Sequence, residues 1–172
     1  MVQENSTSVT VYPMSAEIKP TDANSNDAAA SKAAKRAADS NSAGQFRILY
    51  VEDGPDNQRL VWHILNKTQF TVVIANDGQE AIEEVYRQQE ENEDAYDLIL
   101  MDMQMPRMDG YEATRQLRSA GFTMPIVALT AHALAGDRAK CLAAGCTDYM
   151  AKPIRPKELR AALKSILATP ED

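Results

Sequence analysis

Beyond residue 45, five short apolar runs alternate with longer amphipathic segments, and this alternation limits the possible folds more than any other feature. The runs predict β-strands at 47–51, 71–75, 97–101, 125–129 and 148–151. Helical patterns follow from Pro55, from Gln79, and at 111–120, 133–144 and 156–168. Because a helix leads from each strand to the next, the strands are expected to be parallel, with helices on both faces. The sequence therefore predicts an α/β domain.

Individual residues support these boundaries. Pro55 suits the first turn of a helix, and Gly145 suits the position directly after a helix, where the backbone is often left-handed. The third run, DLILM, is apolar on both faces, which is typical of a strand inside a sheet. The second helix becomes polar at residues 87–94, and we expect this end to project into water.

Residues 1–44 differ in composition from the rest of the chain. Of these residues, 24 are Ala, Ser, Asn or Thr, and Tyr12 is the only aromatic one. Such a segment cannot bury enough apolar surface to fold alone, so we expect a disordered leader or linker before a folded domain at 45–172. The alternative is a partner-binding helix at 28–39, which has helix propensity without a clear apolar stripe.

Overall charge and cysteine content narrow the function class. The chain has 18 Lys and Arg against 25 Asp and Glu, a formal net charge of −7, and no basic run. This disfavours binding to nucleic acid or to an anionic membrane surface, and no sequence window resembles a membrane span or an export signal. Two cysteines, Cys141 and Cys146, are too few for a disulfide framework. We therefore expect a cytoplasmic protein with reduced thiols.

Polar residues follow four of the predicted strands. Glu52 and Asp53 follow the first strand, Asp102 the third, Thr130 the fourth and Lys152 the fifth. Because the carboxyl ends of parallel strands meet at one edge of a sheet, we expect these side chains to converge there. Three close carboxylates repel one another unless a cation lies among them, and Mg²⁺ prefers oxygen ligands. The sequence therefore predicts a magnesium site.

The remaining two residues suit phosphoryl chemistry. Lys152 can pair with Asp102 or with a phosphoryl group, and Thr130 can donate a hydrogen bond to a phosphoryl oxygen. The set suits phosphoryl transfer onto a carboxylate. This interpretation requires Asp102 to be accessible and within a water's reach of its acidic neighbours.

Four motifs, ILYVED, LILMDMQMPRMDG, ALTA and YMAKP, resemble the receiver domain of two-component response regulators over residues 46–168. The stretches ALTAHAL and AAGCTDYMAKPI resemble receivers of hybrid sensor histidine kinases more than they resemble receivers of transcription factors. The resemblance implies a flavodoxin-like fold, a doubly wound five-stranded parallel sheet of order 2-1-3-4-5 flanked by five helices; this order is the one quoted for the family's chemotaxis member.

The resemblance also implies roles for site residues. Asp102 would be the phosphoacceptor, Asp53 a direct Mg²⁺ ligand, Glu52 a ligand through water, and Gln104 a ligand through its backbone carbonyl. Many relatives have Asp in place of Glu52, and Asn is common in place of Gly54. Glutamate keeps the charge and is one methylene longer, so we expect metal binding to be retained.

Further implied roles concern the phosphorylated state. Thr130 and Lys152 would contact the phosphoryl group, and Tyr149 would be the switch aromatic. Gln104 and His132 would tune the lifetime of the phosphoryl group. The Lys152–Pro153 bond would be cis.

The predicted function is a phosphoacceptor that takes a phosphoryl group from a histidine kinase or histidine phosphotransfer protein and changes a protein-binding face. We expect a single-domain protein that signals to a downstream protein, and a fragment of a hybrid kinase is the alternative. The oligomeric state stays open. We expect no turnover enzyme: a Mg²⁺-dependent aspartyl-phosphate phosphatase would need an acidic residue where Gln104 stands. A receiver-like interaction module that is never phosphorylated is the other alternative.

Overall fold

The computed structural model describes residues 10–11, 46–66, 70–90, 96–131 and 135–167. The strands are β1 (Thr10–Val11), β2 (Phe46–Val51), β3 (Phe70–Ala75), β4 (Leu98–Asp102), β5 (Ile126–Thr130) and β6 (Asp148–Ala151). The helices are α2 (Pro55–Leu65), α3 (Gly78–Glu90), α4 (Gly110–Ser119), α5 (Ala135–Ala144) and α6 (Pro156–Leu167).

The strands form one sheet in the order β1-β3-β2-β4-β5-β6. The strands β2 to β6 are parallel, which confirms the predicted order of the five-stranded sheet. A sixth strand was not predicted: β1 pairs antiparallel with β3 at the sheet edge, with Thr10 opposite Ile74. The rest of the predicted leader, including the possible helix at 28–39, lies outside the described residues.

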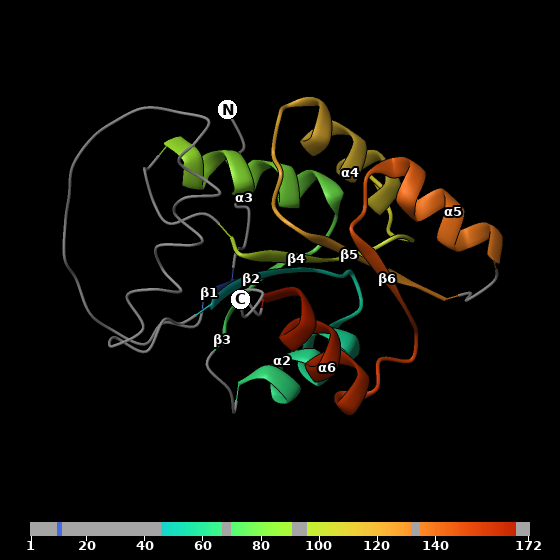
Figure 1. Ribbon diagram of the computed structural model, residues 1–172. Coiled ribbons are helices and arrows are strands. Elements are labelled where there is room, and N and C mark those ends of the chain that lie inside the picture. Colours follow the sequence, from blue (N-terminus) through green and yellow to red (C-terminus); the bar gives the residue numbers. More distant parts are fainter. Residues whose placement is uncertain (1–9, 12–45, 67–69, 91–95, 132–134, 168–172) are drawn as a thin grey trace, which may run out of the picture.

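The helices cover both faces of the sheet (Figure 1). On one face, α3, α4 and α5 enclose a core that includes Leu49, Met101 and Leu117. On the other face, α2 and α6 enclose a core that includes Tyr50, Leu100 and Leu159. Alternate residues of β2 and β4 enter opposite cores, as the strand period of two requires. All five residues of β4 are buried, as the apolar run DLILM predicted for most of them.

Helix ends follow the expected chemistry. Pro55 lies in the first turn of α2, and Asp109 caps α4 by accepting a hydrogen bond from the Glu112 amide at 2.8 Å. Gly145 follows α5 with φ +106°, and the Cys146 amide donates to the Cys141 carbonyl at 3.0 Å. This is the bonding of a Schellman motif, so the prediction for Gly145 is confirmed.

The end of α3 is solvated as expected at Gln89 and Glu90, which are exposed, but not at Gln88. Gln88 is buried, although it lies within the predicted polar end. The segment before β4 covers this part of the helix, because the Tyr96 hydroxyl donates to buried Glu84 at 2.6 Å. Residues 91–95 lie outside the described residues.

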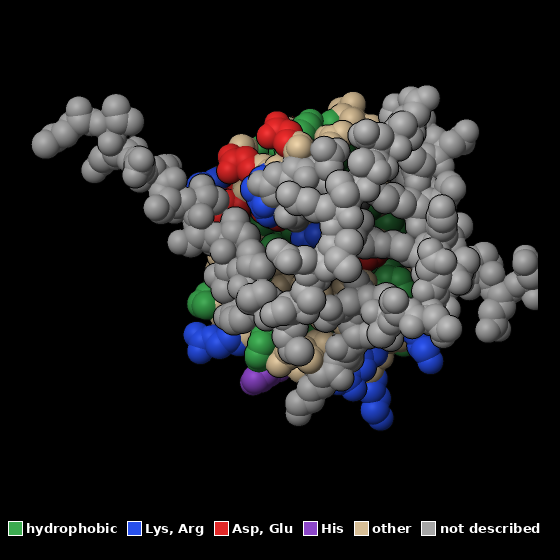
Figure 2. Space-filling view, turned by 90° about the vertical axis from the view of Figure 1, so that its left-hand side faces the viewer, with side chains coloured by type: hydrophobic (Ala, Val, Ile, Leu, Met, Phe, Trp, Pro, Cys, Tyr) green, Lys and Arg blue, Asp and Glu red, His purple; other side chains and the backbone are tan. Residues whose placement is uncertain are grey.

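The surface carries both charge signs. Figure 2 shows acidic side chains near the top of the view with basic side chains beside them, and further basic side chains near the bottom. None of the helices in the described part of the chain is long and apolar enough to span a membrane.

Candidate functional site

The pairing of the strands brings their last residues to one edge of the sheet. Asp102 is paired with Leu129 of β5, and Thr130 is paired with Ala151, the residue before Lys152. Glu52 follows β2, whose other neighbour in the sheet is β4. One carboxylate oxygen from each of Glu52, Asp53 and Asp102 lies within 4.8 Å of the other two. The structure therefore brings the predicted acidic residues together.

Lys152 bridges two of these carboxylates. Its ammonium nitrogen lies 2.6 Å from Glu52 Oε2 and 2.7 Å from Asp102 Oδ2. Burial alone would lower the pKa of Lys152, but the hydrogen bonds to Asp102 and Glu52 outweigh it, so the pKa is raised. Lys152 therefore stays charged and holds the strand ends β2, β4 and β6 together.

Asp102 is less accessible than its predicted role requires. The residue is only 3 % exposed, because Lys152 covers Oδ2 while the Gln104 amide donates to Oδ1 at 3.0 Å. Burial raises the pKa of Asp102, and the Lys152 ammonium and the Gln104 amide limit the rise. The expectation of an accessible Asp102 is therefore wrong for this arrangement, whereas its expected closeness to the other acids is confirmed.

Glu52 is 1 % exposed and accepts hydrogen bonds at both oxygens. Oε1 accepts from Asn57 Nδ2 at 2.8 Å and from the Gly54 amide at 3.3 Å. Oε2 accepts from Lys152 Nζ at 2.6 Å and from the Tyr50 hydroxyl at 3.2 Å. A carboxylate has about four lone-pair positions, so these four donors can fill all of them.

Tyr50 and Asn57 were not predicted as site residues. The strand period of two places Tyr50 and Glu52 on one side of β2, which is the sequence signal that could have identified the tyrosine. Asn57 lies in the first turn of α2, five residues after Glu52, and only the path of the intervening turn brings its amide to the carboxylate.

The loop after Asp102 is held by α3 and by a close backbone approach. The Gly78 amide donates to the Met108 carbonyl at 3.1 Å, and the Arg107 guanidinium lies against the carboxylates of Asp77 and Glu80. A Cβ atom at Gly110 would collide with the Asp102 carbonyl oxygen. The start of α4 therefore packs against the backbone of Asp102 itself.

The other predicted residues have different surroundings. Thr130 is buried at the end of β5, and its carbonyl accepts from the Lys152 amide at 2.7 Å. Tyr149 is half-buried, and the Arg138 guanidinium lies 5.9 Å from its ring centroid. The Gln104 side chain is exposed. The predicted cis bond between Lys152 and Pro153 is confirmed, and His132 lies outside the described residues.

The acidic cluster has the chemistry that Mg²⁺ requires. Its donors are carboxylate oxygens, the hard ligands that this ion prefers. Three carboxylates and the Lys152 ammonium carry a formal charge of −2 together, which one divalent cation would balance. Asp53 is exposed, which leaves a path from solvent to the cluster.

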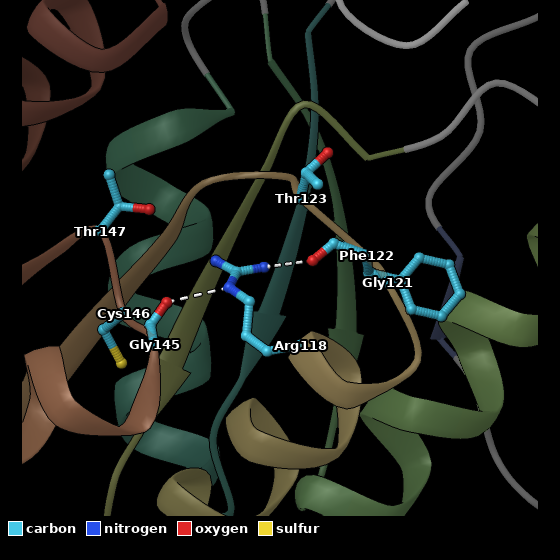
Figure 3. Close-up of a pocket in the computed structure, with 7 residues that line it drawn as sticks. All are labelled: Arg118, Gly121, Phe122, Thr123, Gly145, Cys146 and Thr147. Atoms are coloured by element: carbon cyan, nitrogen blue, oxygen red, sulfur yellow. Dashed lines mark hydrogen bonds between the residues drawn. The ribbon is translucent and has the colours of Figure 1, made fainter. Parts of the chain in front are cut away.

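A hollow separate from the acidic site lies at the other end of the strands, beside the segments that precede β5 and β6 (Figure 3). Arg118, at the end of α4, donates to the carbonyl oxygens of Gly145 at 2.9 Å, Phe122 at 2.8 Å and Met124 at 2.9 Å. These bonds tie together the segments that lead into β5 and β6. The guanidinium therefore donates its hydrogen bonds to backbone carbonyls, and the hollow is separate from the acidic site.

Residues 48–164 match the response regulator receiver domain family. The chain belongs to this family. Among curated relatives, it is 43 % identical over 117 residues to hybrid signal transduction histidine kinase I of Dictyostelium discoideum, covering 66 % of this chain and 7 % of that protein. It is 39 % identical over 122 residues to response regulator MprA of Mycobacterium leprae, covering 71 % and 51 %. The chain thus spans about half or less of these relatives' lengths.

Solved receiver structures have the same fold. The receiver domain of a sensor histidine kinase from Pseudomonas aeruginosa is 42 % identical with a TM-score of 0.63, covering 72 % of this chain and 98 % of that one. That structure has a magnesium ion coordinated in its active site cleft. A chemotaxis protein from Vibrio cholerae is 27 % identical with a TM-score of 0.64, covering 71 % and 98 %. This chain is therefore a receiver domain of two-component signalling.

Proposed function

We propose that this receiver takes a phosphoryl group onto Asp102 from a phosphohistidine of a histidine kinase or histidine phosphotransfer protein, with Mg²⁺ in the acidic cluster. The observation that carries the proposal is the convergence of Glu52, Asp53 and Asp102, with the Lys152 ammonium in contact with Glu52 and Asp102. Residues 45–172 would form the receiver, and residues 1–44 a leader or linker.

The residues of the cluster would divide the work of holding the ion. Asp53 and Asp102 would bind it directly, Glu52 through water, and Gln104 through its backbone carbonyl. When bound, Mg²⁺ supplies positive charge that offsets the charge of the phosphoryl oxygens. The ligand set is supported by the carboxylate oxygens that lie within 4.8 Å of one another.

In the transfer step, an Asp102 oxygen attacks the phosphorus, the new O–P bond forms as the P–N bond breaks, and the donor imidazole leaves with the electron pair and is protonated. Lys152 covers Asp102 Oδ2, so its ammonium must turn from this oxygen to the phosphoryl oxygens during the step. The Lys152 side chain is 20 % exposed and can make this movement toward solvent. The same movement uncovers Asp102.

The acyl phosphate would then act as a switch. The Thr130 hydroxyl would bind a phosphoryl oxygen and Tyr149 would move into the space that it leaves, which changes the face formed by α5, β6 and α6. The half-buried ring of Tyr149, next to Arg138 of α5, supports a role in which its position alters that face. Gln104 and His132 would set how long the phosphoryl group lasts. A downstream protein would bind the altered face.

The donor protein would dock beside the site. Leu60 is 42 % exposed on α2, the helix that starts directly after the acidic pair, and offers an apolar contact for a partner helix.

A phosphohistidine donor is made from ATP, so we place the protein in the cytoplasm. On this proposal the chain is a phosphoacceptor rather than an enzyme that turns over a free substrate.

Incubation with acetyl phosphate and Mg²⁺, followed by intact-mass measurement, tests the proposal. We expect the wild-type chain to gain one phosphoryl group, and Asp102→Asn to gain none. Asp109→Asn is the matched control, because asparagine also caps a helix and Asp109 lies outside the cluster. A wild-type chain that gains no mass, or an Asp102→Asn variant that still gains it, would refute the assignment.

A further inference from the structure

The buried tyrosine of β2 gives Glu52 a fixed hydrogen-bond donor. Tyr50 is fully buried, and its hydroxyl donates to Glu52 Oε2 at 3.2 Å. The ring is part of the core that α2 and α6 cover, so the side chain cannot turn away from the strand end. Among the donors to Glu52, this one comes from the rigid interior of the domain.

The other side-chain donors can leave Glu52. Lys152 is 20 % exposed and is shared with Asp102, and Asn57 is exposed at the start of α2. A cation among the acids would repel the Lys152 ammonium, and a phosphoryl group on Asp102 would attract it. In either case the ammonium would withdraw from Glu52 Oε2, and the Tyr50 hydroxyl would be the donor that stays at this oxygen. An ionised buried carboxylate then depends on the hydrogen bonds that remain.

We infer that Tyr50 is a positioning residue of the metal site, whose hydroxyl holds the Glu52 carboxylate in place when Lys152 leaves it. The inference rests on the proposed function, because it assumes that the cluster binds Mg²⁺. The length of glutamate is part of the arrangement. The side chain of an aspartate at this position would be one methylene shorter, which would withdraw its carboxylate from the tyrosine hydroxyl.

Titration of the metal-free chain with Mg²⁺ by isothermal calorimetry tests this role. We expect Tyr50→Phe to raise the Mg²⁺ dissociation constant about fivefold, less than the roughly 10–100-fold effect of losing a partner of a directly bound ligand, because Glu52 would act through water. In the Glu52→Asp background, Tyr50→Phe should change the constant less than about twofold, because the coupling between the two side chains is already lost.

Tyr96→Phe is the matched control. Tyr96 is also buried and its hydroxyl also donates to a buried glutamate, Glu84, but that pair joins the segment before β4 to α3, away from the acidic cluster. Both variants lose one buried tyrosine–glutamate hydrogen bond and should lower the thermal stability of the metal-free chain. We expect Mg²⁺ affinity to fall for Tyr50→Phe alone.

Three results would overturn the inference. The first is an unchanged Mg²⁺ dissociation constant in Tyr50→Phe, and the second is an equal loss of affinity in Tyr96→Phe. The third is an undiminished effect of Tyr50→Phe in the Glu52→Asp background. A wild-type chain that binds no Mg²⁺ would instead overturn the proposed function, and the inference with it.

Discussion

Replacing Lys152 with methionine removes a positive charge that both Glu52 and Asp102 contact. Glu52 keeps donors from Tyr50, Asn57 and the Gly54 amide, whereas the Gln104 amide is the one other donor found for Asp102 among the bonds of the described residues. Most of the cost therefore falls on Asp102, whose side chain is 5 % exposed.

The magnitude follows from the burial of the pair. Removing one partner of a buried ion pair costs about 3–5 kcal/mol, because the other charge is left uncompensated. The Lys152 side chain is 20 % exposed, and water can take part of its place, so the lower end applies. We expect Lys152→Met to lower the free energy of unfolding by about 3 kcal/mol at pH 8, which is about 10 °C in Tm for a domain of this size.

The loss should depend on pH in a defined direction. The pKa of Asp102 is already raised by burial, and without the ammonium it rises further. A carboxyl whose pKa is higher in the folded than in the unfolded state destabilises the fold when ionised, and this cost disappears as pH falls through the folded-state pKa. The difference in stability between variant and wild type should therefore shrink from pH 8 to pH 5.

Urea unfolding of the metal-free protein at both pH values measures these differences. Lys157→Met is the control, because Lys157 is exposed on α6 and is not among the site residues. We expect it to change stability by less than about 0.5 kcal/mol. The reasoning fails if Lys152→Met is as stable as Lys157→Met at pH 8, or if its loss is the same at both pH values.

Two further predictions concern the core and the turn beside it. Burial raises the pKa of the Cys146 thiol from about 9 to about 11. Because this thiol loses its proton at lower pH in the unfolded chain, the free energy of unfolding of the wild type should fall by about 2–3 kcal/mol between these pH values. Urea unfolding of Cys146→Ala should show a shallower decline over the same range. Gly145→Ala should lower the free energy of unfolding by about 2 kcal/mol in the same assay, because φ is +106° and a Cβ would lie 2.7 Å from Arg118 Cγ. Gly121→Ala, with φ +88° and open space around the position, should cost about half as much. Equal losses would contradict a destabilising contact with Arg118.

The order of elements could be predicted because it depends on the spacing of apolar residues along the chain. Strand boundaries were less certain, since Phe46 and Phe70 lie one residue before the predicted starts of β2 and β3. Their rings pair across the two strands with centroids 6.0 Å apart, and only the register reveals that contact. The strand Thr10–Val11 was missed because two residues in a polar segment carry no periodic signal.

The site shows the same limit at the level of side chains. Because the carboxyl ends of parallel strands lie at one edge of the sheet, the sequence could place Glu52, Asp53, Asp102 and Lys152 there. It could not predict the distances between them. The burial of Asp102 could not be foreseen, because it depends on the position of a single ammonium that two carboxylates share. A side chain that two acids hold in place covers the atom on which the proposed reaction depends. Phosphoryl transfer and the release of Lys152 from Asp102 should therefore be coupled events, with Tyr50 retaining Glu52 while the lysine moves.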